Sequence, residues 1–166
     1  MDKELKNYLN EILASIIDEV VETAYDLLID TLNQTIYQPQ PSDAQYERTY
    51  EFRDKAWVKK TKGLLSEYIG ELYFDGMKMS PQSYNVNSGY SHGNLEKGID
   101  RRKDMASILD DWRRNDLESD WAKAPGAYWV TEEGYWDKFI DAFEAELDKI
   151  CMKKFKQYGL KVEKVG

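Results

Sequence analysis

Histidine, cysteine and paired carboxylates do most of the chemistry in enzymes, so they are considered first. His92 is the only histidine, and it lies in the polar stretch SGYSHGN without a cysteine or an acid at metal-ligand spacing. A single histidine excludes most catalytic triads and most histidine metal sites. We therefore expect His92 to have a surface or capping role, with contact to a partner protein as the alternative.

Cys151 is the only cysteine, which excludes an internal disulfide and a thiolate zinc cage. It falls within a helical pattern, where a small buried apolar side chain is the expected role. Carboxylate pairs occur at Asp110–Asp111 and Glu132–Glu133. General acid–base catalysis needs two carboxyls in different environments, one of them desolvated, whereas adjacent acids on a helix are explained by solvation and the helix dipole. An acid-pair hydrolase is an alternative that this pattern supports only weakly.

The chain contains no GxGxxG, GxxxxGK[ST], GxSxG or DxDxDG motif, and we expect no cofactor, no metal and no catalytic residue. Aromatic residues are frequent in two stretches that read as loops, and such rings can stack on single-stranded bases. These rings are not interleaved with Arg and Lys, so packing or contact with a protein is the better interpretation. They are Tyr84, Tyr90, Trp121, Tyr128 and Trp129.

Composition points to one domain over residues 1–166 with an acidic surface, because the net charge is −8. An acidic chain is poorly suited to gripping phosphates. With 12 Tyr and 5 Trp, either an aromatic core or an aromatic interface is expected. The N-terminus has no apolar signal core, and no apolar run approaches the roughly 20 residues of a membrane span. We expect a soluble protein made in a reducing cytoplasm, without a membrane partner.

The charge is unevenly distributed along the chain. Residues 1–36 carry eight acids against two lysines, residues 53–62 carry five bases against one acid, and lysines crowd the C-terminal end. Such alternation has two explanations: solvated faces of one subunit, or complementary surfaces on neighbouring copies in an assembly.

The elements that would position these residues begin with a long helix in residues 1–36. Apolar residues recur there at three- and four-residue steps over about 45 Å of helix, with most acids on the other side. Prolines at 39 and 41 should end it. The apolar positions are Leu5, Leu9, Ile12, Leu13, Ile16, Val20, Ala24, Leu27 and Leu28.

Residues 37–62 form a Pro/Tyr elbow with a short helix. Ser42 opens a capping-box pattern, and Thr49 is an alternative N-cap for a second short helix. Helical spacing continues to about Lys60. It includes Tyr46, Thr49, Tyr50, Arg53 and Trp57.

Residues 63–79 alternate imperfectly, which predicts one or two strands with Asp75–Gly76 as a turn and Gly70 as a bulge or bend. Residues 80–98 read as a long loop. Residues 99–166 read as two helices, with Asp100 and Thr131 as N-caps, Gly159 as a stop and LKVEKV as a possible closing strand. The fold class is α+β, with a long N-terminal helix and C-terminal helices packed on a small antiparallel sheet.

Several stretches together resemble the neck and tail-completion proteins of tailed bacteriophages, a family of minor capsid, tail-component and head–tail joining proteins. IYQPQPSDAQYERTYEF matches the family's Y-x-P…Y-x-R-T connector through Tyr46, Arg48 and Thr49. ELYFDGMKM resembles its strand, and SHGNLEKGIDRRKDMASILDDW its His-Gly loop and D-x-R before a helix. YWDKFIDAFEAELDKICMKKFKQYGLKV resembles its last helix. Tyr50 stands where many members have glycine, and APGAYW stands in place of the usual Arg-Pro-Phe.

The resemblance implies a non-catalytic structural protein of the virion, made in the bacterial cytoplasm, that forms a ring at the head–tail junction. Its implied partners are copies of itself, other neck, portal or tail proteins, and DNA that passes without sequence-specific binding. The alternatives are a small soluble enzyme and a regulatory protein-binding module. Arg48 has two interpretations, a bond within its own subunit or a salt bridge to the next copy. The structural and interface candidates are Pro39, Pro41, Tyr46, Arg48, Thr49, Tyr50, Trp57, Asp100, Arg102, Trp129 and Trp136.

Overall fold

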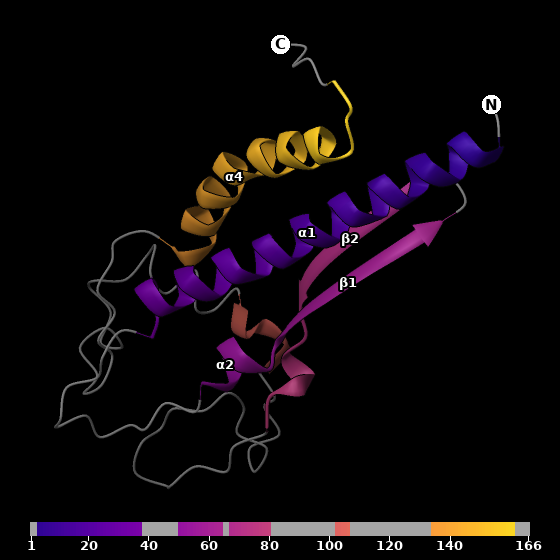
Figure 1. Cartoon of the computed structure of the whole chain (residues 1–166). Helices are drawn as coiled ribbons and strands as arrows, with labels where there is room; N and C mark the ends of the chain where they lie inside the picture. Colours follow the sequence, from indigo (N-terminus) through magenta and orange to yellow (C-terminus); the bar gives the residue numbers. More distant parts are fainter. Residues whose placement is uncertain (1–2, 38–49, 65–66, 81–101, 107–133, 162–166) are drawn as a thin grey trace, which may run out of the picture. The chain divides into compact units, whose positions relative to one another are not determined.

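The structure is a computed structural model that describes residues 3–37, 50–64, 67–80, 102–106 and 134–161 (Figure 1). It is an α+β arrangement of a long N-terminal helix, a C-terminal helix and a two-stranded antiparallel sheet, as the sequence predicts. The elements are α1 (Lys3–Thr35), α2 (Glu51–Asp54), β1 (Trp57–Leu64), β2 (Glu67–Phe74), the 3₁₀ turns η1 (Gly76–Lys78) and η3 (Arg102–Asp104), and α4 (Tyr135–Gln157).

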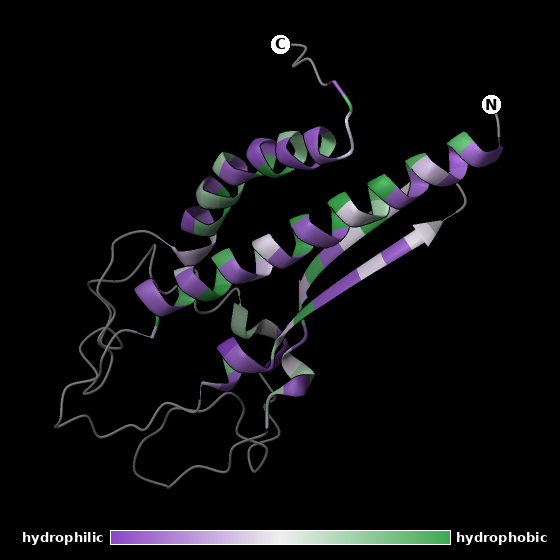
Figure 2. Ribbon diagram, viewed as in Figure 1, coloured by the Kyte–Doolittle hydropathy of each residue, from purple (hydrophilic) through white to green (hydrophobic). Residues whose placement is uncertain are grey.

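The chain divides into two compact units. The first unit takes its described residues from Met1–Leu28, Lys59–Leu72 and Phe139–Gly166, and the second takes them from Ile29–Val58 and Tyr73–Lys138. Hydropathy alternates along both long helices, and much of β1 is hydrophilic (Figure 2).

In the first unit, α1 packs on one face of the hairpin made by β1 and β2. The closest approach is at Gly70, where an added Cβ would lie 2.4 Å from Val21 Cγ2 and 3.0 Å from Ile17 Cγ2. Glycine is needed at this position because any side chain would push the helix away from the strand. The sequence predicted a bulge or bend at Gly70, but β2 runs through it without a break.

The strand register follows from contacts across the hairpin. Lys60 lies opposite Glu71, and Gly63 lies beside the ring of Tyr68. This register joins the strands at residues 65–66. Asp75–Gly76 is therefore a turn after the hairpin and not its tip: Asp75 Oδ1 accepts from Met77 N at 3.2 Å and caps η1.

The helix expected to continue to about Lys60 was wrong. α2 ends at Asp54, and Trp57 begins β1. Trp57, Val58 and Thr61 favour strands, and pairing with β2 outweighs both the lysines between them and the helical spacing of the preceding aromatics. Thr49 is not the N-cap either, because that position belongs to Tyr50, whose side chain makes no capping bond.

The predicted stop at the C-terminal end of α4 can be compared with the structure, whereas several other predicted features cannot. At the C-terminus of α4 Gly159 has φ +71°, Leu160 N donates to Phe155 O and Gly159 N donates to Lys156 O, so the predicted stop is confirmed as a Schellman motif. The described residues do not include the Ser42 and Thr131 caps, the prolines, the loop at 80–98 beyond Ser80 or most of the helix after Asp100. Met105 in that helix is described and buried, as its apolar spacing predicts.

Candidate functional site

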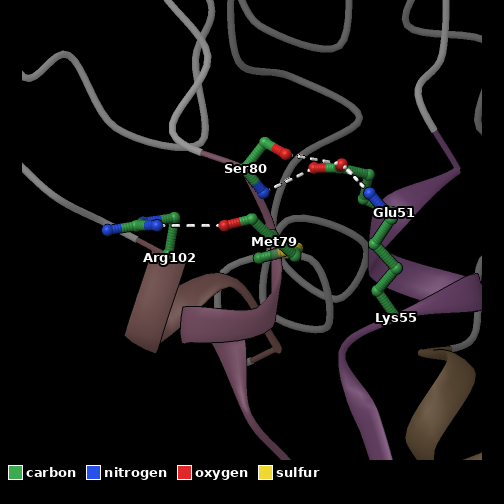
Figure 3. Close-up of polar contacts among 5 residues, drawn as sticks. All are labelled: Glu51, Lys55, Met79, Ser80 and Arg102. Atoms are coloured by element: carbon green, nitrogen blue, oxygen red, sulfur yellow. Dashed lines mark hydrogen bonds and ion pairs between the residues drawn. The ribbon is translucent and has the colours of Figure 1, made fainter.

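Two buried charged side chains of the second unit, Glu51 of α2 and Arg102 of η3, bind the segment after η1 (Figure 3). Glu51 Oε2 accepts from Ser80 N at 2.7 Å, and Oε1 accepts from Ser80 Oγ at 2.8 Å and from Lys55 Nζ. The Glu51 side chain is 10% exposed, while that of Lys55 is 52% exposed. Glu51 therefore fastens Ser80 to α2 with both of its oxygens in use.

The ionisation of Glu51 follows from these bonds. Burial raises the pKa of the carboxyl group, but hydrogen bonds from Lys55 and Ser80 favour the carboxylate and together hold the pKa below its ordinary value of 4.5. A group that is ionised and fully hydrogen-bonded at neutral pH holds neighbouring chain segments in place. It is poorly suited to passing protons to a substrate.

Arg102 secures the other side of this group. Its guanidinium is buried and donates from Nη1 to Met79 O at 2.9 Å (Figure 3). The carbonyl oxygen of Arg102 lies 1.8 Å from where a Cβ on Gly76 would be, so η1 and η3 touch through their backbones. Arg102, a candidate from the sequence, thus has a structural contact within its own unit.

Arg53 forms a second polar arrangement, and it was not a site candidate. Its guanidinium lies 5.3 Å from the ring centre of Tyr37 and 4.9 Å from that of Tyr50, and the two rings are 5.0 Å apart. Nη1 donates to Asn33 Oδ1 at 2.8 Å, and Nε donates to Asp54 Oδ1 at 2.6 Å. The hydrogen bond to Asp54 raises the pKa of Arg53 despite partial burial.

The same arrangement holds Tyr50 in a backbone conformation that is unusual for tyrosine. Its φ is 57° and its ψ is 3°, and it is the only described residue other than glycine with a positive φ. Left-handed backbone costs an L-residue roughly 1–2 kcal/mol, a cost that glycine largely avoids. Contact with the tilted Tyr37 ring and the Arg53 cation over its own ring hold the Tyr50 side chain in this conformation.

An aromatic cluster forms the core of the second unit. Phe52 contacts the rings of Trp57, Phe74 and Tyr135 at centroid distances of 5.8, 5.4 and 5.9 Å. Trp57 also stacks on Trp136 at 6.0 Å, and Tyr135 Oη donates to Ala106 O at 3.0 Å. Of the two expectations for the aromatic residues, Phe52, Trp57 and Tyr135 show a core role, whereas Trp136 lies exposed at the edge of the cluster.

The candidate residues therefore fall into two groups. Tyr50, Trp57, Arg102 and Trp136 are described, and the structure brings Trp57 and Trp136 together within the aromatic cluster. The remaining candidates lie outside the described residues, as does His92. They are Pro39, Pro41, Tyr46, Arg48, Thr49, Asp100 and Trp129.

Among the described residues, ion pairs join the elements of the first unit, whereas the buried polar side chains all lie in the second unit. Lys59 Nζ lies 2.5 Å from Glu22 Oε2 and 4.4 Å from the ring centre of Tyr25. Lys154 Nζ lies 2.5 Å from Glu19 Oε2 and so ties α4 to α1. These pairs account for part of the acidic and basic stretches as contacts within one subunit.

Cys151 lies half-buried in α4. Burial, followed by the nearby Asp148, raises the pKa of its thiol, which keeps it protonated at neutral pH. Among the described residues, no three His, Cys, Asp or Glu side chains are grouped as metal ligands. Within those same ranges, no helix is both long enough and apolar enough to span a membrane.

Comparisons with known proteins found no relative of this chain. No family model matches the chain, and no curated protein or solved structure is significantly similar to it.

Proposed function

We propose that this chain is a non-catalytic structural subunit of a tailed-phage virion, assembled as a ring at the head–tail junction. The proposal starts from the order of motifs that resemble the neck and tail-completion family. The structure adds one observation that carries it further, a row of exposed acids along α1.

This acidic row is continuous over most of the first unit's helix. Glu4, Glu11, Asp18, Glu22 and Asp26 are all exposed and follow one another at steps of seven, seven, four and four residues. These steps keep them within less than a third of the helix circumference. The charge of Glu22 is offset within the subunit, because Lys59 Nζ lies 2.5 Å from its Oε2. A row of carboxylates repels phosphates, so a channel lined by it would let DNA slide without sticking.

Tyr50 gives a second line of support. The family pattern has glycine after Arg-Thr, and Tyr50 at this position has the left-handed backbone that glycine adopts most readily. The same turn would then be kept in this chain by the Tyr37–Arg53–Tyr50 stack instead of by glycine.

Mass spectrometry of purified virions tests the proposal. We expect several copies of the chain per particle, at a stoichiometry comparable to that of other neck proteins. Its absence from virions in which other minor proteins are detected would overturn the proposal.

The role of the acidic row needs a separate test. Virions carrying Glu11→Lys and Asp18→Lys together should assemble but release DNA more slowly than wild type. The matched control places lysine at two exposed acids of α4, Asp141 and Glu144, and should release DNA normally. Equal release by both variants would remove the channel-lining role while leaving the ring proposal in place.

A further inference from the structure

The two strands of the first unit carry opposite charges. β1 reads WVKKTKGL, with three lysines and no acid, and β2 reads EYIGELYF, with two glutamates and no base. Within one copy, Lys60 Nζ and Glu71 Oε2 lie 4.0 Å apart across the hairpin. The charges therefore favour β1 beside β2.

The register places Lys60 and Glu71 on the face of the sheet that is turned away from α1, whereas Lys59 lies on the helix side and pairs with Glu22. Gly70 faces α1, so its neighbours Ile69 and Glu71 face away from the helix, as does Lys60 opposite Glu71. The side chains of Lys60 and Glu71 are 45% and 44% exposed, and Ile69 is 39% exposed. This face thus combines an apolar side chain with charges of both signs.

The sheet also has two edges. Among the described residues it consists of β1 and β2 alone, so each strand has one edge without a neighbouring strand in that part of the chain. Backbone N–H and C=O groups at such an edge can pair with a strand of another molecule. An isolated two-stranded sheet is only marginally stable, and added strands would stabilise it.

We propose that β1 of one copy pairs with the outer edge of β2 of the next copy, which extends the sheet from subunit to subunit. The proposal rests on the ring function proposed above and names the surface that would build the ring. All strands in the extended sheet alternate in direction, and each lysine-bearing strand lies between two glutamate-bearing strands.

The charges of β1 and β2 favour this head-to-tail arrangement over a two-fold dimer. Pairing β1 with β1 would bring lysines together, and pairing β2 with β2 would bring glutamates together; like charges opposite each other destabilise a sheet. The favoured β1–β2 contact uses different surfaces on the two partners. Such head-to-tail contacts produce closed rings or open filaments, not two-fold dimers.

The competing explanation is that the lysines only protect β1 from aggregation, a common use of lysine on edge strands. That explanation leaves β2 unprotected, because its exposed residues include Ile69 and Tyr73 and it has no lysine. The protection explanation also predicts that the chain is a monomer, and that changing the charges of β2 does not alter its oligomeric state.

Charge reversal of one strand at a time separates these explanations. Lys60→Glu with Lys62→Glu makes both strands acidic, and Glu67→Lys with Glu71→Lys makes both strands basic. We expect each variant alone to dissociate at concentrations at least about tenfold above wild type in multi-angle light scattering. Mixing the two variants should restore assembly, because each acidic strand then meets a basic strand of the other variant.

Two controls keep this result interpretable. Lys156→Glu with Lys161→Glu makes the same charge change at exposed positions outside the sheet and should assemble like wild type. If reversal of Lys60 or Glu71 disturbs the hairpin, as judged by circular dichroism, Lys62→Glu and Glu67→Lys repeat the mixing test without touching that ion pair.

The outcomes separate the proposed pairing of β1 with β2 from the proposed ring and virion roles. A wild-type ring that is insensitive to both reversals, or folded variants that do not assemble when mixed, would overturn strand pairing and leave the ring proposal standing. A wild-type chain that stays monomeric would overturn both, whereas a chain absent from virions that still passes the mixing test would overturn only the virion role.

Discussion

The two units of the molecule are stabilised by different means. In the second unit, Phe52 and its aromatic neighbours form a tight core, and Glu51 and Arg102 are buried with their polar groups bonded. In the first unit, the close approach at Gly70 is supplemented by exposed lysine–glutamate pairs, and large apolar side chains such as Leu13 stay exposed. Among the described residues both units keep large apolar side chains exposed, such as Leu13 in the first and Met77 in the second, so the units differ in their aromatic core and buried polar groups and not in completeness.

The largest effect is expected at the centre of the aromatic core. Phe52 is 1% exposed, and Phe52→Ala should lower the free energy of unfolding by about 3–5 kcal/mol, since it removes a ring that three others contact. Urea denaturation measures this loss. Leu13→Ala, at a residue 41% exposed in the first unit, is the control and should change stability by less than about 0.5 kcal/mol. Similar losses for both would contradict the contrast.

The first unit should be most sensitive at Gly70. Gly70→Ala places a methyl group 2.4 Å from Val21 Cγ2 and should cost about 1–3 kcal/mol through overpacking between α1 and β2. Gly63→Ala is the matched control, because its nearest neighbour is the edge of the Tyr68 ring at 3.0 Å, which can turn aside. A Gly70→Ala variant as stable as wild type would show that α1 does not press on β2.

Glu51 should give the second unit a distinctive dependence on pH. Because its folded-state pKa lies below 4.5, Glu51 stabilises the fold above that pH and loses this effect as the pH falls through the folded-state value. Glu51→Gln should cost about 1–3 kcal/mol at neutral pH, and the difference from wild type should shrink as the pH falls below 4.5.

This prediction is checked by urea denaturation across the pH range. Glu144→Gln, at an exposed position of α4, should be neutral throughout. A constant difference between Glu51→Gln and wild type at every pH would show that charge at Glu51 does not matter.

Tyr50 tests whether backbone strain is stored in the second unit. Tyr50→Gly and Tyr50→Ala both remove the stacked ring, but glycine accepts a φ of 57°, so it should be the more stable by roughly 1 kcal/mol. At Leu13 within α1 the order should reverse, because glycine is the poorer helix former by about 1 kcal/mol. Thermal unfolding of the four variants makes the comparison. A Tyr50→Ala variant more stable than Tyr50→Gly would contradict the claim that the backbone at Tyr50 is strained.

The smallest effect is expected from the ion pair on the first unit. The hydrogen bond to Glu22 raises the pKa of Lys59 above 10.5, so the pair stabilises the fold below that pH and is lost as the pH rises through the folded-state value. Glu22 is 60% exposed, so Lys59→Met should cost only about 0.2–1 kcal/mol and less at high salt. Lys161→Met is the control, and a loss as large as that of Gly70→Ala would show that ion pairs dominate this unit.

The sequence allowed the regular elements to be predicted better than the contacts. The spacing of Ile12, Ile16 and Leu28 and the stop at Gly159 each reflect local rules, and the structure has α1 and the end of α4 as expected. The sequence analysis assigned Trp57 to a helix, whereas it begins β1. Its neighbour across the hairpin is Phe74, 17 residues later in the chain, so no local pattern around Trp57 indicates the strand.

The polar contacts were harder to predict, and for a physical reason. Glu51 and Ser80, like Tyr37 and Arg53, are separated in sequence and brought together by tertiary packing, so no local pattern indicates them. At Tyr50 a signal would come from the proposed resemblance to neck proteins, whose pattern has glycine at this position. A glycine position in a related pattern suggests a left-handed backbone even when the residue present is tyrosine.

Head-to-tail assembly through β1 and β2 is tested most directly by the mass of the purified wild-type chain, measured by light scattering over a range of concentrations. One chain has a mass of 19.5 kDa. We expect a discrete species of three or more chains that gives way to smaller ones on dilution or at high salt. A constant mass of 19.5 kDa, or of twice that value, would contradict head-to-tail pairing.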